Sequence, residues 1–252
     1  MKRSLAFSLF TPFLLSTTVL SIAAISPSGS QLVEIMSALP VQDETRTFNV
    51  SNFDKLDLGS AFTIHVTRGS GYKVTASGRG DDLDDLEAKV INNKLQVRYK
   101  DKLGWNRNRQ RVTVTITMPD LKSVSFSGAS KSDVTGFRNL KDLGVDISGA
   151  STSTIEVDAE RVMVDLSGAS NVTLTGQAKR LDGDVSGATT LKAYDLKVSS
   201  AKVELSGASS ARMNVSDRLD ADASGASSLT YRGSASIRSN TSGASSIKSV
   251  DR

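Results

Sequence analysis

The sequence contains no cysteine, and this absence removes several kinds of chemistry at once. Without a thiol, the chain forms no disulfide, holds no iron–sulfur cluster and offers zinc no cysteine ligand. It also lacks the cysteine that carries the lipid of a lipoprotein. Proline is scarce as well, with four residues in 252, and this scarcity favours long runs of regular secondary structure.

Aromatic residues make up only 5% of the chain, so a hydrophobic core must be built from valine, leucine, isoleucine and alanine. His65 is the single histidine, and it lies far in sequence from the repeats described below. A serine nucleophile needs a nearby base, and one histidine cannot serve many equivalent serines. Two S-x-x-K motifs, which begin at Ser70 and Ser199, lack the companion motifs of serine–lysine enzymes. We therefore expect no catalytic residues and no cofactor.

The first 30 residues differ from the rest of the chain and resemble a secretory signal peptide. Lys2 and Arg3 provide the positive start, and the segment 5–25 is apolar or small throughout. The alternative is an uncleaved membrane anchor, because 21 residues can just span a bilayer, although Pro12 weakens that interpretation. Cleavage near residue 30 lowers the net charge from +4 to +2. An exported chain with so little excess charge is not expected to bind nucleic acid.

Seven copies of the tripeptide S-G-A recur at intervals of 18 to 21 residues, and the next residue is always serine or threonine. Repeats of this period, with small variations in length, are typical of a solenoid in which each repeat forms one coil. The serines that begin the copies are Ser127, Ser148, Ser167, Ser186, Ser206, Ser224 and Ser242.

Residues on both sides of each S-G-A-S motif alternate between apolar and polar. Before Ser206, for example, Val203 and Leu205 alternate with Lys202 and Glu204. A period of two predicts a β-strand with one buried face. Two such strands in each repeat predict an all-β parallel β-helix whose coils stack about 4.8 Å apart. A β-sandwich would show hairpin turns such as Asn-Gly, and a propeller blade needs about 40 residues.

The S-G-A-S motif is expected to form the corner between the two strands of a coil. Gly168 permits the bend, and Ala169 is small enough to point into the tight interior. Ser167 and Ser170 can hydrogen-bond to the backbone or to the same serine of the next coil. Stacked coils are therefore expected to form a ladder of S-G-A-S corners.

The chain before the repeats has a different pattern. Residues 46–120 alternate like strands but lack the period, and we interpret them as wider first coils or as an irregular β-rich cap over the end of the solenoid. Within them, residues 81–90 favour one or two helical turns. The expected organisation is a signal peptide at 1–30, a linker at 31–45 and one continuous domain, in which the S-G-A-S solenoid occupies 121–252.

A column of acidic residues stands two positions before the serine of successive motifs and comes into line if the coils stack in register. Like charges about 5 Å apart repel one another, so the column requires cations, basic neighbours or backbone donors. One hypothesis is weak binding of Ca²⁺, which prefers oxygen ligands. We favour the alternative, in which solvent, Lys202 and Arg238 screen the charges, because the Asp-Gly spacing of calcium-binding β-rolls is absent. The column consists of Asp146, Asp165, Asp184, Glu204 and Asp222.

A polar, basic segment at residues 104–111 carries the only tryptophan of the chain. Trp105, Arg107 and Arg109 form a candidate binding loop for an anionic glycan or a lipid. The alternative interpretation is an ordinary exposed loop on the cap.

Three stretches carry a family resemblance: FDKLDLGSAFTIHVTRGSGYKVTASG at 53–78, KLQVRY at 94–99, and VTVTITMPDLKSVSFSGAS at 112–130, followed by the repeated SGAS. Together they resemble the bacterial head GIN domain, a domain of unknown function described as the head of auto-transporter adhesins. The resemblance covers residues 47–250. It implies an exported envelope protein folded as a right-handed parallel β-helix, and it carries over no catalytic residues. The sequence includes no β-barrel translocator, so the auto-transporter part of the description finds no support in it.

These observations predict an exported, non-enzymatic protein of the bacterial cell envelope that binds in the manner of an adhesin. The alternative is an envelope structural or assembly protein with no small ligand. A polysaccharide-active enzyme is disfavoured, because no long insertion between repeats builds a cleft. The expected partner is an envelope protein or a glycan, and the expected location is the periplasm, the outer membrane surface or the medium. Membrane contact is expected only through the signal sequence, if it is not cleaved.

Overall fold

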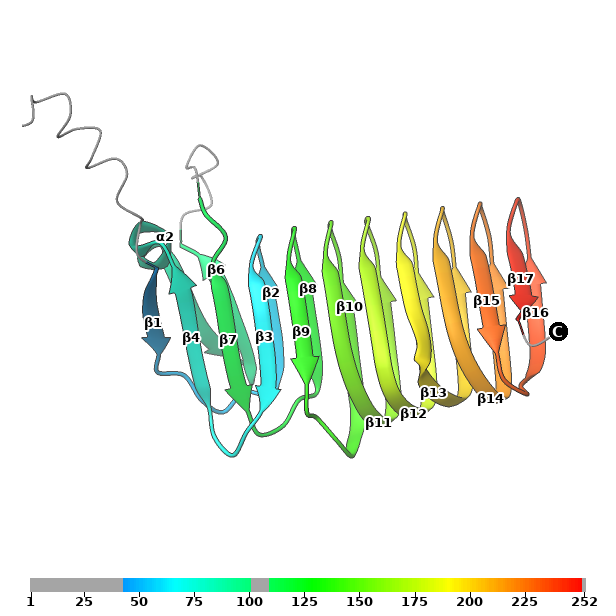
Figure 1. The fold of residues 1–252 in the computed structure, drawn as a ribbon, viewed down its shortest axis with the longest axis horizontal. Helices are drawn as coiled ribbons and strands as arrows, with labels where there is room; N and C mark the ends of the chain where they lie inside the picture. The colour runs from blue at the N-terminus through cyan, green and yellow to red at the C-terminus, as the bar shows by residue number, and fades with distance from the viewer. Residues whose placement is uncertain (1–42, 101–108, 251–252) are drawn as a thin grey trace, which may run out of the picture. The chain divides into compact units, whose positions relative to one another are not determined.

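The computed structural model describes residues 43–100 and 109–250, which form a stack of β-strand coils with one short helix near its start (Figure 1). The predicted signal peptide, most of the predicted linker, and Trp105 and Arg107 of the candidate loop lie outside the described residues. In the part of the chain that is described, no helix has the length and apolar character needed to cross a membrane.

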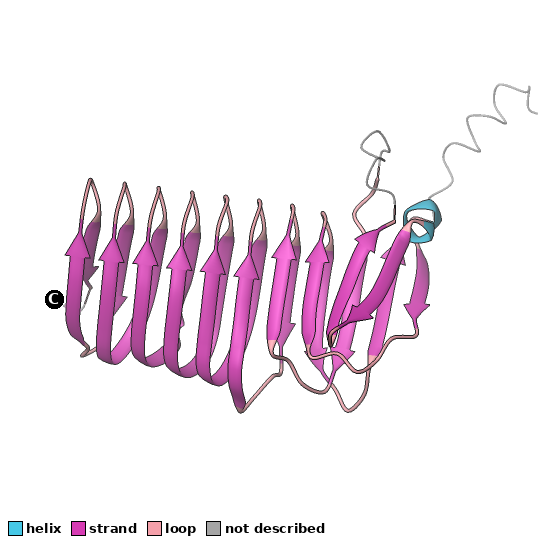
Figure 2. Ribbon diagram, turned by 180° about the vertical axis from the view of Figure 1, so that it is seen from behind, coloured by secondary structure: helices cyan, strands magenta, loops and turns pink. Residues whose placement is uncertain are grey.

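The strands of the repeat region run along one side of each coil, turn at the SGAS corner and return along the other side (Figure 2). We call the strands before each corner the upstream layer and the strands after it the downstream layer. Strands β11 to β14 each bend in the middle, at what we call the lateral bend, and so belong to both layers. Their bounds are β8 (Ser123–Ser127), β9 (Lys131–Thr135), β10 (Leu140–Ile147), β11 (Thr152–Leu166), β12 (Asn171–Val185), β13 (Thr190–Leu205), β14 (Ser210–Ala223), β15 (Ser228–Arg232), β16 (Ser236–Thr241) and β17 (Ser246–Ser249).

Equivalent residues of successive repeats are paired in parallel register. Val145 lies opposite Val124 and Val164, and Ile155 lies opposite Val134 and Leu174. This pairing confirms the predicted all-β parallel solenoid, which has about seven turns. The right-handed sense stays a prediction.

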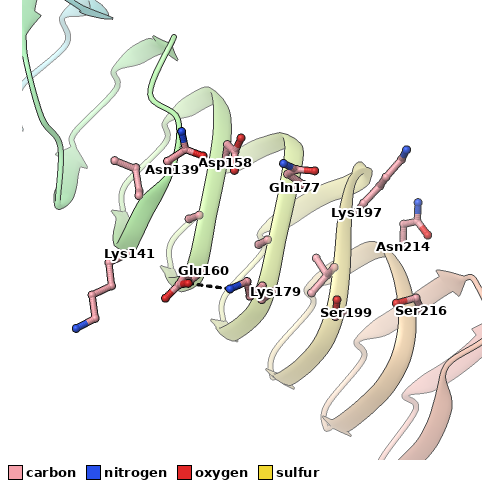
Figure 3. A pocket seen from close by; sticks show the side chains of 14 residues that line it. Asn139, Lys141, Asp158, Glu160, Gln177, Lys179, Lys197, Ser199, Asn214 and Ser216 are labelled. Atoms are coloured by element: carbon pink, nitrogen blue, oxygen red, sulfur yellow. Dashed lines mark hydrogen bonds and ion pairs between the residues drawn. The ribbon is translucent and has the colours of Figure 1, made fainter.

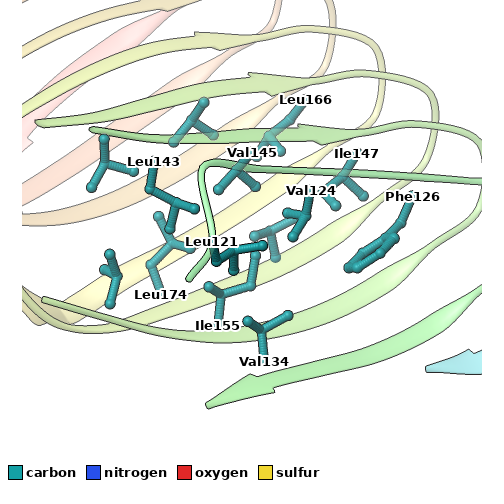
Figure 4. Packing of buried hydrophobic residues seen from close by; sticks show 14 of the residues in the cluster. Leu121, Val124, Phe126, Val134, Leu143, Val145, Ile147, Ile155, Leu166 and Leu174 are labelled. Carbon is teal, nitrogen blue, oxygen red and sulfur yellow. The ribbon is translucent and has the colours of Figure 1, made fainter. Parts of the chain in front are cut away.

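The core lies between the two layers, and the alternation in the sequence determines which side chains enter it. Figure 4 shows these side chains converging from both layers, among them Leu143 and Val145 from one side and Ile155 and Leu174 from the other. All four are buried, with at most 2% of their surface exposed. Because one coil alone leaves this face uncovered, burial depends on stacking against the next coil.

At the SGAS corner, the residue that faces the interior is not the one that the sequence predicted. Ala169 is exposed, whereas Ser170 is fully buried, so the prediction that the alanine points into the interior is wrong. Gly168 takes a φ of +78°, a left-handed conformation, which turns the alanine outward and the second serine inward. The buried Ser170 hydroxyl donates to the backbone oxygens of Ser167 at 3.0 Å and Gly149 at 3.2 Å.

Backbone hydrogen bonds tie each corner to the one before it. The N–H of Ala150 donates to the oxygen of Gly128 at 2.7 Å, and the N–H of Ala169 donates to that of Gly149 at 2.8 Å. The same bond recurs at each later corner as far as Ala244. The corners therefore extend the parallel ladder around the turn between the two layers.

The N-terminal strands extend both layers, but not in the order of the sequence. Strand β2 pairs in parallel with β6 and β8, and β3 pairs in parallel with β7 and β9. The coil β2–β3 therefore lies between β6–β7 and β8–β9. The bounds are β1 (Glu44–Phe48), β2 (Lys55–Gly59), β3 (Thr63–Arg68), β4 (Lys73–Gly78), α2 (Gly80–Asp84), β5 (Leu86–Ile91), β6 (Lys94–Tyr99) and β7 (Thr113–Met118).

Antiparallel strands end both layers at this side of the stack. Strand β5 pairs with β6, β4 pairs with β7, and β1 pairs with β4. The expected helix at 81–90 is a single turn, α2, and residues 86–91 form β5 instead. The turn between β2 and β3 is a further corner, in which the N–H of Ser60 donates to the oxygen of Ser127 at 3.3 Å. Its sequence, Gly-Ser-Ala, has the small residues of the motif in another order.

Candidate functional site

The structure brings all five predicted acidic residues into one line on the outer face of the upstream layer. Each is the register partner of the next, from β10 through to β14. Ser125 precedes the line and Asn240 follows it. We call the set the acidic row, and its members are Asp146, Asp165, Asp184, Glu204 and Asp222.

Neighbouring side chains partner several members of the acidic row. The hydroxyl of Ser125 donates to Asp146 at 3.1 Å, and the amide of Asn240 donates to Asp222 at 2.7 Å. Lys202 forms an ion pair with Glu204, with an N–O distance of 2.8 Å. Neighbouring polar and basic side chains therefore offset part of the negative charge of the acidic row, and the predicted Lys202 is one of them.

Asp165, in the middle of the row, shows the effect of crowding like charges. Burial raises the pKa of its carboxyl group, and the negative charges of Asp146 and Asp184 raise it further. Among residues 43–100 and 109–250, no three carboxylate or histidine side chains are grouped closely enough to hold one metal ion. The row is therefore a line of negative charge along the outer face of the upstream layer.

Arg109 of the candidate loop is held at the N-terminal end of the stack. Its guanidinium group forms an ion pair with Asp85 at 3.2 Å and lies over the ring of Tyr99, 4.0 Å from the ring centre. Burial is the main reason why the pKa of Tyr99 is raised. These contacts occupy Arg109 within the cap, as a cation–π pair and a half-buried ion pair.

His65 and the repeat serines occupy different environments. His65 is exposed on the downstream layer, where its register partners are Thr115 and Asp133. The second serines of the corners are buried, and Ser151 and Ser170 form hydrogen bonds within their own corner and to a neighbouring coil. The buried hydroxyl groups of Ser209 and Ser227 have no hydrogen-bond partner among the described residues. Their hydroxyl groups therefore take part in the packing of the corner.

A groove that the sequence did not predict runs along the lateral bends, at the edge opposite the SGAS corners. It has a volume of about 960 Å³, within the range of ordinary ligand sites. Its lining residues are 139–141, 158–160, 177–179 and 197–199, together with Asn214 and Ser216. We call it the lateral groove.

The lateral groove has polar walls and a small apolar floor. Asp158, Gln177 and Lys197 are register partners on successive coils and follow one another along one wall (Figure 3). On the other wall, Glu160 accepts a hydrogen bond from Lys179 at 2.7 Å, and this contact is the main cause of the lowered pKa of Glu160. The buried floor consists of Leu140, Ala159, Ala178 and Val198.

One signal in the sequence marks the bends that form this groove. Alternation breaks where two outward residues follow each other, as at Glu160-Arg161 and Lys179-Arg180. In sequence alone such pairs look like ordinary loop residues, so the groove could not be inferred from them.

The fold and these surfaces define a β-solenoid protein with polar outer faces. The family described as "Putative auto-transporter adhesin, head GIN domain" matches residues 52–235, and the chain belongs to this family. This match confirms the resemblance that the sequence suggested. No curated protein matches the sequence.

Solved structures of bacterial proteins share the fold. A putative adhesin from Bacteroides fragilis matches with a TM-score of 0.75 and 22% identity, covering 83% of this chain and 97% of its own. A putative adhesin from Parabacteroides distasonis has a TM-score of 0.63 and 15% identity, with coverage of 83% and 97%. A protein from the same species named a putative lipid binding protein has a TM-score of 0.64 and 16% identity, with coverage of 82% and 96%.

Proposed function

We propose that this chain is an exported, non-enzymatic binding protein of the bacterial cell envelope that acts in the manner of an adhesin. The observation that supports it most directly is the lateral groove, which combines a ligand-sized volume with polar walls repeated from coil to coil. Membership of the adhesin head family is consistent with such a role. A rigid stack of paired strands suits binding, because the side chains on its outer faces are positioned before the ligand arrives.

The proposal includes export through the N-terminal segment at 1–30, followed by residence in the periplasm, on the outer membrane surface or in the medium. A basic start followed by an apolar stretch is the sequence feature that supports this.

A second candidate function is an envelope structural or assembly protein without a small ligand. Strands β16 and β17 favour it, because within residues 43–100 and 109–250 each pairs with a strand on one side only, with β14 and β15 respectively. An unpaired strand edge can add a strand from another chain.

Fractionation of the native bacterium, followed by binding measurements with the purified full chain, tests the proposed function. We expect the chain outside the cytoplasm and bound to isolated envelopes or to a glycan array, with the bound glycans unchanged on analysis. A cytoplasmic location, a lack of binding to both surfaces, or cleavage of the glycans would overturn it. Binding to one envelope protein alone, with no glycan bound, would favour the second candidate.

A further inference from the structure

The lateral groove is linear and periodic. Five successive coils contribute to it, and each contributes the same positions on either side of the bend (Figure 3). Because stacked strands are about 4.8 Å apart, four steps between coils give a length of about 19 Å. A ligand that uses the whole groove must therefore be extended and must present similar groups at regular intervals.

One wall of the groove offers side chains that have no partner among the described residues. Asp158, Gln177 and Lys197 form no side-chain hydrogen bond or ion pair with any residue of 43–100 and 109–250. On the opposite wall, by contrast, Glu160 and Lys179 are paired with each other. A carboxylate, an amide and an ammonium group thus lie in register on three successive coils. The carboxylate accepts hydrogen bonds, the amide both donates and accepts them, and the ammonium group donates them.

Much of the backbone of the groove is already engaged in strand pairing, although the pairing skips Glu160, Lys179 and Ser199. Through the lateral bends, Asp158 pairs with Gln177 and Ala159 with Ala178, and the ladder continues from there to Lys197. A peptide that binds as an added strand needs a free strand edge, and the strands β11, β12 and β13 are paired on both sides. Side chains are therefore the main groups through which the groove can recognise a ligand.

We propose that the lateral groove binds a linear, uncharged glycan, an inference that rests on the proposed adhesin-like function. Sugar hydroxyl groups both donate and accept hydrogen bonds, so they match the mixed wall of Asp158, Gln177 and Lys197. Ala159 and Ala178 form a floor that is only 6% exposed at each residue, so the hydrogen-bonding groups of the wall provide most of the contacts to the ligand.

The charge and length of the groove specify the glycan further. Three lysines and two carboxylates line it, and one lysine is already paired, so the wall does not have the dense positive charge that a polyanion requires. Each sugar ring of an extended glycan advances the chain by a distance comparable to one coil. Affinity is therefore expected to rise with chain length until the five coils are covered.

A pair of matched triple variants of the full chain tests this assignment. The groove variant carries Asp158→Ala, Gln177→Ala and Lys197→Ala. The control variant removes the same kinds of group from the outer face of the downstream layer, and its substitutions are Asp133→Ala, Asn171→Ala and Lys192→Ala. The probes are neutral glucan, xylan and mannan oligosaccharides of increasing length, and affinity is measured by titration calorimetry, with the melting temperature as a check on folding.

We expect at least one neutral series to bind the native chain and the control variant equally. The groove variant should bind it about 10- to 100-fold more weakly, the effect of losing two or three hydrogen bonds. Equal weakening in both variants, or none in the groove variant, would overturn the assignment to this groove. Binding of anionic glycans alone, or of vesicles or peptides in place of sugars, would overturn the ligand class. In these cases an exported chain that still binds envelopes would leave the proposed function intact.

Discussion

The two edges of the solenoid, at the SGAS corners and at the lateral bends, differ in how regular they are. At the SGAS edge the same four residue positions recur at each corner, and a backbone hydrogen bond of 2.7–2.8 Å joins each corner to the next. At the lateral edge the residues differ from coil to coil, and the register shifts, for example between Ala193 and Lys197. The first edge fixes how the coils stack, and the second is free to vary, which is where we place the binding groove.

Differences in repeat length support this division. The interval between motifs ranges from 18 to 21 residues, whereas the motif itself always has four. The irregular pairings of β12, β13 and β14 fall between the corners, in the downstream strands and the lateral bends. Extra residues in the longer repeats are therefore accommodated between the corners, where β-bulges can take up one additional residue in a strand.

Inserting one glycine at each edge should produce the largest contrast. An insertion between Ala169 and Ser170 breaks the corner ladder and moves the buried hydroxyl out of place, and we expect a loss of more than about 4 kcal/mol in the free energy of unfolding. An insertion between Lys179 and Arg180 lengthens a bend that already varies, and we expect a loss of about 1 kcal/mol. Urea denaturation measures both. Equal losses at the two edges would contradict the comparison.

Gly168→Ala tests the corner without changing its length. Gly168 has a φ of +78°, and a Cβ atom on it would lie 2.5 Å from the oxygen of Gly149, which belongs to the backbone of the preceding coil. Left-handed strain and this clash together should cost about 2–4 kcal/mol.

Gly183→Ala serves as the control for that substitution. An added Cβ at Gly183 meets the side chain of Leu181 at 3.4 Å, an ordinary contact, and no left-handed backbone is required there. Because alanine reduces the entropy of the unfolded chain, we expect a gain of about 0.5–1 kcal/mol. If both alanine variants lost stability equally, the special geometry of the corner would be disproved.

Ser170→Ala measures the contribution of a buried corner hydroxyl. The Ser170 hydroxyl shares its single proton between two backbone oxygens in a fully buried position, so its removal should cost about 1–2 kcal/mol in thermal or urea unfolding. The matched change at the lateral edge is Ser199→Ala, because the Ser199 side chain forms no hydrogen bond with the described residues. That variant should lie within about 0.5 kcal/mol of the native chain.

The sequence predicted the repeating part of this molecule well, because its information is local. A fixed motif and a period of two determine the strands, the buried side chains and the alignment of Asp146 with Asp165. The orientation of Ala169 was predicted wrongly, because size alone does not show which way a left-handed glycine turns the next residue. The position of β2–β3 between later strands depends on pairing between distant segments that share no repeat. The lateral groove depends on packing at bends whose residues look like ordinary loops.

The contrast between the edges extends to two aspartates on the same layer. Asp182 lies nearer the lateral bend, where Arg180 and Arg161 reach it at 2.8 Å and 2.7 Å. The hydrogen bond from Arg180 is the main cause of its lowered pKa, and burial opposes it. Asp165 lies nearer the corner, where burial and the carboxylates of Asp146 and Asp184 raise its pKa. The lateral bends thus supply basic residues that pair with Asp182, whereas the neighbours of Asp165 in the acidic row are other carboxylates.

The pH dependence of two asparagine variants gives the smallest but most specific test of this difference. A lowered pKa means that Asp182 stabilises the folded state above the ordinary aspartate pKa, and that this contribution disappears as the pH falls through its folded value. Asp182→Asn should therefore lower the melting temperature at neutral pH and have little effect in acid.

Asp165→Asn should act in the opposite direction. Its raised pKa means that the charged form disfavours folding, so the native carboxyl is best tolerated below the ordinary aspartate pKa and becomes unfavourable as the pH rises through its folded value. The variant should raise the melting temperature by about 1–2 °C at neutral pH, a size suited to a largely exposed group, and the gain should vanish on acidification. Melting curves across this pH range measure both variants. Melting-temperature shifts of the same sign at neutral pH would show that the arginines of the lateral bend do not make Asp182 different from Asp165.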